Sequence, residues 1–347
     1  MKAALQRLTQ GLSLTGAGAE AAMQRILDGV ALPTQIAGFV TALSAKGVTA
    51  VELAGLVRAI RNSSVSFPAS SDVLDTCGTG GDGHDTFNIS TAAAIVAAAS
   101  GVRIAKNGNR SASSRCGSAD VLEALGVRID LSPKQSVECL DQLGISFLYA
   151  PLYLPAFRHA AVVRRELEVR TIFNYLGPLC NPAQAKFQII GVAEAGMVPV
   201  IAEALVQLGT QRALIFSSDD GLDELSLSAP SRMIEIRNNH TSLSVLQPAE
   251  LGLNPAPIED LRGGDPADNA EIIHRVLAGE KGPHRDIVLL NTAAALRIAG
   301  EVNDWRAALD RGSRTIDSGA AAALLKKWIG VTQAYIADPR EIDSEAP

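Results

Sequence analysis

Asp75-Thr76-Cys77-Gly78-Thr79-Gly80-Gly81-Asp82-Gly83 is the stretch that decides the fold of this 347-residue chain. The apolar pair Val73-Leu74 precedes it as a short strand, and four of its last six residues are glycine. Glycine adopts positive φ angles and lets backbone N–H groups approach an anion closely, so such a loop can form a concave site for phosphate. The stretch therefore predicts a strand that runs into a phosphate-binding loop. A tight turn without a ligand is the simpler alternative.

A helix and a second strand follow this glycine loop. Phe87-Asn88-Ile89-Ser90-Thr91 opens an alanine-rich helix, whose first amides and hydroxyls offer a second anion site. Val102-Arg103-Ile104-Ala105 then has the pattern of a strand and ends at Lys106. Because strands alternate with helices in this way, the sequence predicts βαβ units and a parallel sheet of the α/β class.

A dinucleotide-binding fold is the main structural alternative, since Gly78, Gly80 and Gly83 also satisfy the pattern GxGxxG. In that fold the helix begins at the third glycine, and an acidic residue ends the second strand. Here the helix begins several residues later, and the second strand ends at Lys106. A cation at this edge of the sheet suits a phosphate better than a ribose hydroxyl, which disfavours the dinucleotide fold.

A basic loop follows the second strand. Lys106-Asn107-Gly108-Asn109-Arg110 continues to Arg115 and Ser118, and the loop brings three cations to a chain whose net charge is −6. In a parallel sheet this loop lies beside the glycine loop, at the strand ends where α/β proteins bind ligands. A solvated loop with incidental cations is the alternative for this segment taken alone.

An acidic loop is the third candidate element. Asp219-Asp220-Gly221-Leu222-Asp223-Glu224 follows the apolar strand Leu214-Ile215-Phe216, and its carboxylates are hard oxygen ligands suited to Mg²⁺, which accompanies polyphosphates. An exposed acidic loop without a metal is the alternative. Asp219-Asp220 also matches the acidic pair of the type I phosphoribosyltransferases, but no hydroxyl- and glycine-rich phosphate loop follows it.

The bulk composition excludes several classes of partner. A net charge of −6 argues against a broad nucleic-acid or membrane surface, because such surfaces need spread-out basic patches. The four cysteines have no CxxC spacing, so neither a zinc site nor a disulfide framework is indicated. The sequence also shows no export signal and no apolar run long enough to span a bilayer. We therefore expect a cytoplasmic protein with reduced thiols.

Two other regions bear on domain organisation. The residues before about position 65 have the pattern of short amphipathic helices, and the turn-rich stretch 62–71 is a candidate linker. Further along, Gly177-Pro178 and Asn181-Pro182 are predicted to break any helix in the segment that begins at Arg170. An arginine such as Arg164 can clamp a carboxylate, although a solvated helix is the commoner explanation for it.

Taken together, these segments resemble the anthranilate phosphoribosyltransferases, a family marked by a GTGGD loop, an NIST segment, a KHGNR loop, an RTIFN…GPL…NP stretch and a DE pair. The motifs follow one another in the same order over roughly residues 1–340. The resemblance implies a small all-helical N-terminal domain, residues 1–68 with 165–190. It also implies a larger α/β domain, residues 69–164 with 191–347, around a mostly parallel, mixed sheet. Members of the family are usually homodimers through the helical domain.

The resemblance implies transfer of the phosphoribosyl group of 5-phosphoribosyl-1-pyrophosphate (PRPP) to the amine of anthranilate, a step of tryptophan synthesis, with Mg²⁺ as cofactor. An aromatic amine is already a neutral nucleophile, so electrostatic positioning without a covalent catalytic nucleophile is expected. The donor would be bound by Gly78, Thr79, Gly80, Gly81, Asp82, Thr86, Asn88, Ser90, Thr91, Lys106 and Ser118. The acceptor would be contacted by Gly78, Asn107, Asn109, Arg164 and Pro178. The metal would be held by Ser90, Asp223 and Glu224.

Two positions depart from the family pattern. Asn107 stands where the family has histidine, and Glu168 stands where it has glycine before the RTIFN stretch. Asn107 lies in the implied acceptor pocket, so another aromatic amine is an alternative acceptor. A nucleoside phosphorylase of the same superfamily and a non-catalytic homologue that binds nucleic acid are further alternatives. The intact GTGGD and RTIFN…GPL segments disfavour the first, and the acidic net charge disfavours the second.

Overall fold

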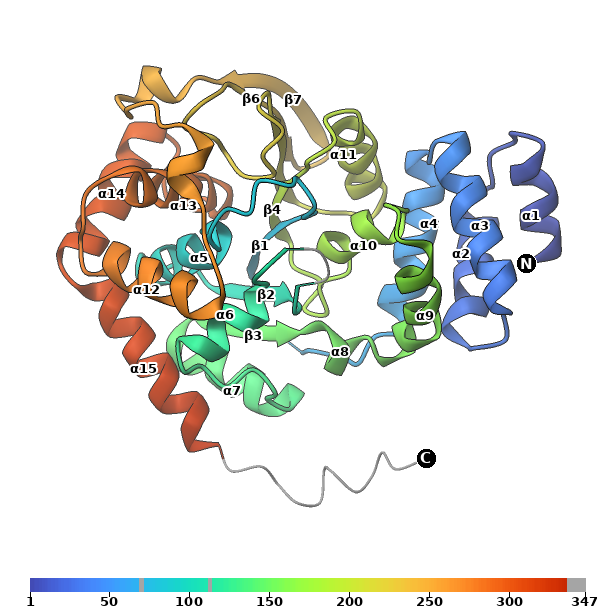
Figure 1. The fold of residues 1–347 in the computed structure, drawn as a ribbon, viewed down its shortest axis with the longest axis horizontal. Helices are drawn as coiled ribbons and strands as arrows, with labels where there is room; N and C mark the ends of the chain where they lie inside the picture. The colour runs from blue at the N-terminus through green and yellow to red at the C-terminus, as the bar shows by residue number, and fades with distance from the viewer. Residues whose placement is uncertain (69–71, 112–113, 336–347) are drawn as a thin grey trace.

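The structure of the protein is a computed structural model that describes residues 1–68, 72–111 and 114–335. A helical N-terminal part stands at one end of the molecule, and a larger α/β part is built around a twisted sheet (Figure 1). The predicted fold class is therefore confirmed. Residues 69–71, which include the predicted domain boundary and the end of the predicted linker, lie outside the described part.

Within the described residues, the sheet has the strand order β3-β2-β1-β4-β5-β6-β7. Neighbouring strands from β3 to β5 run parallel, whereas β6 and β7 are added antiparallel at one edge. The strands are β1 (Leu74–Gly78), β2 (Ile104–Gly108), β3 (Ile145–Tyr149), β4 (Phe187–Gly191), β5 (Arg212–Ser218), β6 (Ser231–Arg237) and β7 (His240–Leu246). The central position of β1 places the glycine loop between the ends of β2 and β4.

Apolar side chains cover both faces of the parallel strands. In β5, Leu214 and Phe216 belong to one buried cluster, and Ala213 and Ile215 belong to another. The first cluster includes residues of α5 and α13, and the second includes residues of α4 and α11. Parallel strands are usually buried on both faces in this way, which explains why Leu214-Ile215-Phe216 of β5 is a continuous apolar run.

The helices of the N-terminal part are α1 (Lys2–Thr9), α2 (Gly16–Leu27), α3 (Pro33–Lys46) and α4 (Ala50–Asn62). Hydroxyl caps set two of their starts: Thr15 Oγ1 accepts from Gly18 N, and Thr49 Oγ1 accepts from Glu52 N. The apolar cluster of these helices continues without interruption to α11 and β5, so the helical part shares its core with one face of the sheet.

The remaining helices are α5 (Ile89–Ala99), α6 (Ser118–Ala124), α7 (Pro133–Leu143), α8 (Ala150–Tyr153), α9 (Arg158–Leu167), α10 (Phe173–Leu179), α11 (Met197–Gln207), α12 (Pro266–Leu277), α13 (Pro283–Ala299), α14 (Trp305–Asp317) and α15 (Ala320–Ala334). Helix α9 packs against α2 and α3, and α10 packs against α4, so both lie beside the helical part although they follow β3 in the chain (Figure 1). Within the described ranges, every helix is too short or too polar to cross a membrane.

Helix α10 corrects one expectation from the sequence. Gly177-Pro178 does not break the helix, because α10 continues to Leu179 with Pro178 inside it. The proline stands in the last turn, where it removes only one helical hydrogen bond, and it is buried together with Leu176 and Leu179. The Pro178 carbonyl accepts a hydrogen bond from Gln188 Nε2 at 2.9 Å. Packing and this bond compensate for the weak helix propensity.

Candidate active site

The glycine loop leaves the end of β1 and turns toward β4 and the acidic loop. Thr79 N donates to the Gly191 carbonyl at 2.9 Å, and Gly80 N donates to Asp223 Oδ2 at 2.6 Å. A side chain at Gly78 would collide with the Asp223 carboxylate, so glycine is required there by the close approach of the two loops. The glycine loop and the acidic loop therefore contact each other directly at the carboxyl ends of the strands.

Arg170 holds the glycine loop from the other side. Its Nη1 donates to the carbonyls of Gly80 (2.9 Å) and Gly81 (2.7 Å), and its guanidinium lies 5.8 Å from the centre of the Tyr175 ring. Gly80 and Gly81 have φ angles of 68° and 73°, and this conformation turns their carbonyls toward Arg170. Arg170 is not among the residues predicted for the site from the sequence. Its only signal was its place at the start of the RTIFN stretch.

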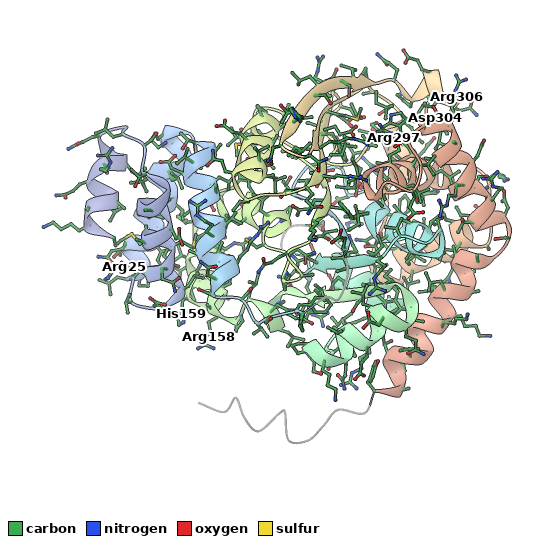
Figure 2. All side chains as sticks on the ribbon, turned by 180° about the vertical axis from the view of Figure 1, so that it is seen from behind. Arg25, Arg158, His159, Arg297, Asp304 and Arg306 are labelled. Carbon is green, nitrogen blue, oxygen red and sulfur yellow. The ribbon has the colours of Figure 1, made fainter. Side chains whose placement is uncertain are left out.

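His84 joins the glycine loop to the acidic loop. Its ring Nε2 lies 3.1 Å from the Asp220 carbonyl, and its backbone N–H donates to Asp82 Oδ1 at 3.2 Å. His159, by contrast, lies at the surface of the helical part near Arg25 and Arg158 (Figure 2), where its ring covers Gly29. Neither histidine was predicted to be functional, and His84 proves to be a contact between two site loops.

The acidic loop places two carboxylates beside the start of α5. Glu224 Oε1 accepts from Ser90 N at 3.1 Å, while Asp223 N lies 3.5 Å from Asp82 Oδ2. Burial and the neighbouring charge of Asp82 raise the pKa of Asp223, and burial and the charge of Asp223 raise the pKa of Glu224. Three carboxylates therefore share a confined space, and a cation would relieve their repulsion.

The donor set suits magnesium. Ser90, Asp223 and Glu224 offer only oxygen atoms, which Mg²⁺ prefers. In the described ranges, no group of three or more histidine, cysteine, aspartate or glutamate side chains is arranged as a complete metal site. Mg²⁺ commonly uses one or two carboxylates and takes its other ligands from water and substrate phosphates. The residues present fit such a shared metal.

Lys106 lies beneath the same region. It is only 2% exposed, and its Nζ donates to the Thr76 carbonyl and to Ser90 Oγ, the latter at 3.3 Å. A buried ammonium needs such acceptors, because an unpaired charge is costly in the interior. Lys106 thus places a fixed positive charge under the first turn of α5.

The other predicted donor residues surround this turn. Asn88 stands at the N-cap position of α5 without a capping hydrogen bond and donates through Nδ2 to the Cys116 carbonyl at 3.2 Å. Ser118 begins α6, with its Oγ 3.4 Å from the Asn109 carbonyl. Thr86 forms an isolated bridge with Arg262. Among the described residues, the buried atoms Asn88 Oδ1 and Thr91 Oγ1 have no hydrogen-bond partner. The hydrogen-bonding capacity of these two atoms is therefore not used by the described residues.

Three of the predicted acceptor residues lie in or beside α10, namely Asn107, Arg164 and Pro178, whereas Gly78 ends β1 and Asn109 belongs to the basic loop. Asn107 is 4% exposed and donates through Nδ2 to the Gly177 carbonyl at 3.2 Å, next to Pro178. Arg164 is exposed on α9, with its guanidinium 5.6 Å from the ring centre of Phe173, the first residue of α10. Asn109 is exposed in the basic loop. The side chain of Asn107 therefore faces the segment that carries Pro178.

The order and length of these elements agree with known proteins. Two family models match: the glycosyl transferase family, helical bundle domain, over residues 2–64, and the glycosyl transferase family, a/b domain, over residues 70–322. Anthranilate phosphoribosyltransferase 2 of Streptomyces coelicolor is 54% identical over 91% of this chain and 94% of its own length. The chain belongs to the anthranilate phosphoribosyltransferase family. The resemblance found in the motifs is confirmed.

Solved structures of the anthranilate phosphoribosyltransferase family have the same fold. The enzyme from Thermus thermophilus has a TM-score of 0.91 and 40% identity, and the match covers 95% of this chain and 99% of that chain. The Saccharomyces cerevisiae enzyme in complex with PRPP and Mg has a TM-score of 0.87 and 26% identity, with coverage of 96% and 99%.

One departure from the anthranilate phosphoribosyltransferase pattern has a clear structural meaning. Glu168 ends α9 with a φ angle of 51°, in the left-handed region. Glycine is favoured at such a helix end because it lacks the Cβ that makes this conformation costly. The glycine of the family pattern therefore suits this backbone better than glutamate does.

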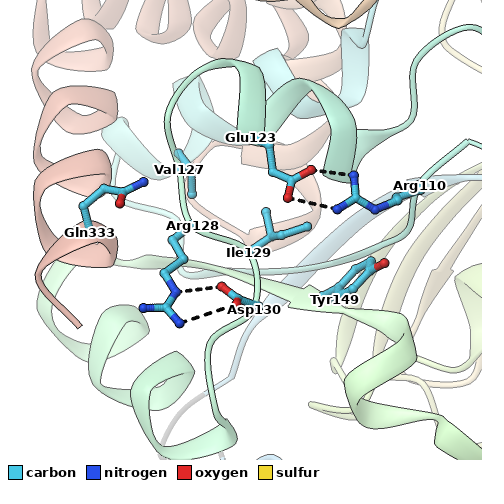
Figure 3. Close-up of a pocket in the computed structure, with 8 residues that line it drawn as sticks. All are labelled: Arg110, Glu123, Val127, Arg128, Ile129, Asp130, Tyr149 and Gln333. Atoms are coloured by element: carbon cyan, nitrogen blue, oxygen red, sulfur yellow. Dashed lines mark hydrogen bonds and ion pairs between the residues drawn. The ribbon is translucent and has the colours of Figure 1, made fainter. Parts of the chain in front are cut away.

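A larger hollow of about 350 Å³ lies outside this constellation (Figure 3). Arg110 lines it, but its guanidinium is already bound to Glu123 by two hydrogen bonds of 2.5 and 2.9 Å. Arg128 is paired in the same way with Asp130, at 2.7 and 3.4 Å. Both guanidinium groups are already paired with carboxylates. The hollow is therefore a poorer site for a phosphate than the glycine loop.

Proposed function

We propose that this protein transfers the 5-phosphoribosyl group of PRPP to the amine of anthranilate and releases pyrophosphate, a step of tryptophan synthesis. The observation that carries the proposal is the direct meeting of the glycine loop with the Asp223-Glu224 pair, through the 2.6 Å bond from Gly80 N to Asp223 Oδ2. A phosphate-binding loop and a metal-binding carboxylate pair on one edge of a sheet suit a pyrophosphorylated sugar.

The donor is proposed to occupy the space between the glycine loop, the start of α5 and the basic loop. The Ser90 hydroxyl in the first turn of α5 and the buried positive charge of Lys106 suit its phosphates. The residues proposed to bind the donor are Gly78, Thr79, Gly80, Gly81, Asp82, Thr86, Asn88, Ser90, Thr91, Lys106 and Ser118. The orphaned oxygens of Asn88 and Thr91 support this assignment.

Ser90, Asp223 and Glu224 are proposed to hold Mg²⁺. When bound, the ion supplies positive charge that stabilises the pyrophosphate leaving group. The residues of the glycine loop, the acidic loop and the start of α5 orient the donor for reaction. They can do so because hydrogen bonds fix these segments to one another before the substrate binds. The amine of anthranilate is neutral and nucleophilic, so no covalent intermediate with a side chain is needed.

The acceptor is proposed to lie against Gly78, Asn107, Asn109, Arg164 and Pro178. Arg164 carries the positive charge suited to the anthranilate carboxylate, and the position of Asn107 against α10 supports its place at this pocket. Asparagine in place of histidine removes a ring that can stack and titrate. A related aromatic amine as acceptor is therefore the second candidate function.

The proposal also covers cellular location, oligomeric state and domain division. The chain is proposed to act in the cytoplasm and to form a homodimer through a helical domain of residues 1–68 and 165–190, with residues 69–164 and 191–347 as the donor-binding domain. The packing of α9 and α10 against α2, α3 and α4 supports this division.

The test is a fluorescence assay. Anthranilate is fluorescent as a free amine, and its signal should fall only when PRPP and Mg²⁺ are both present. Repeating the assay with other aminobenzoates separates the two acceptors. Higher kcat/KM with another amine than with anthranilate would favour the second candidate, and no PRPP-dependent loss with any amine would contradict both.

A further inference from the structure

Asn291 lies in the middle of α13 and reaches the acidic loop from below. Its side chain is buried, with the residue 4% exposed. Its Oδ1 accepts from Leu225 N at 3.1 Å, and its Nδ2 donates to the Leu225 carbonyl at 3.2 Å and to the Ile287 carbonyl at 3.0 Å. The amide therefore holds both backbone polar groups of one residue, as a neighbouring strand would.

The residue that Asn291 holds is directly after Glu224. The Glu224 carbonyl is itself bound by Ser218 Oγ at 2.8 Å, so the backbone is fixed on both sides of the peptide that joins Glu224 to Leu225. A carboxylate on a short loop is placed only as well as its backbone is placed. With these bonds formed, Glu224 Oε1 meets Ser90 N at 3.1 Å.

The surroundings of Asn291 make this clamp rigid. Helix α13 spans 17 residues and packs against α5, the helix that begins beside Ser90. Asn291, Ser90 and Glu224 line one small cavity between these helices and the sheet. Helix α13 therefore supports the acidic loop from the protein interior. It does so through the hydrogen bonds between Asn291 and Leu225.

We propose that Asn291 is a positioning residue for Glu224, which orients this carboxylate toward Mg²⁺ without touching substrate or metal itself. The inference rests on the proposed function, because it takes the acidic loop to be the metal site. Supporting side chains of this kind typically change metal affinity or activity by about 10- to 100-fold when they are removed.

The test compares Asn291→Leu with Thr292→Val. Leucine has the same branching as asparagine with a somewhat larger volume, and it removes the three hydrogen bonds. Thr292 is the next residue of α13, is fully buried and donates to the Ala93 carbonyl at 3.4 Å, away from the acidic loop. Calorimetry follows Mg²⁺ binding in the presence of pyrophosphate, and steady-state rates give the half-saturating Mg²⁺ concentration and the KM for anthranilate.

For Asn291→Leu we expect Mg²⁺ binding at least about tenfold weaker, with the KM for anthranilate within about twofold of wild type. Thr292→Val should leave Mg²⁺ binding within about twofold. Equal Mg²⁺ affinities in wild type and Asn291→Leu, or an equal loss in both variants, would overturn the proposal. If Asn291→Leu does not fold, Asn291→Ser shortens the side chain so that it no longer reaches both backbone groups of Leu225, and it should weaken Mg²⁺ binding in the same direction. Unchanged binding in that variant would overturn the proposal.

The outcome also separates this inference from the proposed function. A wild-type protein that binds Mg²⁺ with pyrophosphate but does not consume anthranilate contradicts the proposed acceptor and leaves the Asn291 comparison intact. A wild-type protein that binds no Mg²⁺ with pyrophosphate contradicts the metal assignment and the inference together.

Discussion

On the proposed donor side of the site, the glycine loop, the start of α5 and the acidic loop contact one another directly, whereas the proposed acceptor residues come from separate parts of the chain. Gly80 binds Asp223, Ser90 binds Glu224, and Lys106 binds Ser90. On the acceptor side, Arg164 packs on a phenylalanine ring of α10, and Asn107 reaches the same helix from β2.

The difference has a physical consequence. The proposed donor side is a network of hydrogen bonds of 2.6 to 3.3 Å at one edge of the sheet, so it is ordered before any ligand binds. It also brings the buried carboxylates of Asp223 and Glu224 together, which is electrostatically unfavourable. On the proposed acceptor side, the distances between residues depend on how α9 and α10 pack against the sheet. This is because Arg164 and Pro178 belong to these helices, whereas Asn107 belongs to β2. Substitutions on the donor side should therefore have large and specific effects, and those on the acceptor side should have smaller effects.

The largest effect is expected from breaking the donor side. Asp223→Asn combined with Glu224→Gln should lower kcat at least about 100-fold even at saturating Mg²⁺, because the charge that holds the ion is lost. The same variant should have a higher Tm than wild type in EDTA, since two mutually repelling buried carboxylates are removed.

Asp219→Asn is the matched control for that variant. Asp219 belongs to the same loop, but its carboxylate is paired with Arg232 at 2.7 Å. We expect turnover within about twofold of wild type, because an exposed ion pair contributes little. A loss of turnover as large as that of the double variant would indicate that Asp219-Asp220, and not Asp223-Glu224, holds the metal.

The second effect concerns Asp75, which lies between the two sides and accepts from Asn107 N at 3.0 Å. Burial raises the pKa of Asp75 from its ordinary value of 3.8 to about 6, against the opposing charge of Lys106. Between pH 4 and 6 the unfolded chain loses this proton while the folded protein keeps it, so folding stability falls as pH rises. The full cost is about 3 kcal/mol.

Asp75→Asn should therefore be more stable than wild type at pH 7.5 and equally stable at pH 4. Thermal melting in EDTA at both values measures the difference. Asparagine can still accept from the Asn107 amide, so the hydrogen bond is kept. A Tm difference that does not change with pH would contradict the raised pKa.

A smaller effect is expected from Asn107→His, which tests the acceptor side. A histidine N–H can also donate to the Gly177 carbonyl, so the contact with α10 is preserved. If anthranilate is the acceptor, its KM should stay equal or improve by up to about fivefold, which corresponds to about 1 kcal/mol, with the KM for PRPP unchanged.

The same variant distinguishes the second acceptor. If the chain is adapted to another amine, Asn107→His should lower kcat/KM for that amine and raise it for anthranilate. Initial rates with both amines measure the ratio. A change confined to the KM for PRPP would indicate that the side chain at position 107 contacts the donor and not the acceptor.

The smallest effect is expected at Glu168, where α9 ends in the left-handed region. Glu168→Gly should stabilise the protein by about 0.5–1 kcal/mol, because glycine adopts this conformation without strain. Glu166→Gly is the matched control inside the same helix, and there the change should destabilise by about 1 kcal/mol. Urea unfolding measures both, and effects of the same sign would contradict the role of the φ angle.

That the proposed donor residues lie close together could be predicted from the sequence, because they form local motifs. The glycine loop, the NIST segment and the DE pair each place their residue types at fixed short spacings, and the alternation of strands and helices brings them to one edge. Helix α10 was predicted less well, since a helix of two turns depends on packing more than on propensity, and burial overrides its proline.

By itself, the sequence determined the fold class, the family and which residue types are available for phosphate and metal, since these follow from local pattern and order. Only the tertiary structure decided which side chains hold those loops in place. Arg170 reaches Gly80 across 90 positions, His84 reaches Asp220 across 136, and Asn291 reaches Leu225 across 66. No local spacing encodes such pairs, because they exist only once the strands have met in one sheet and the helices have packed on it.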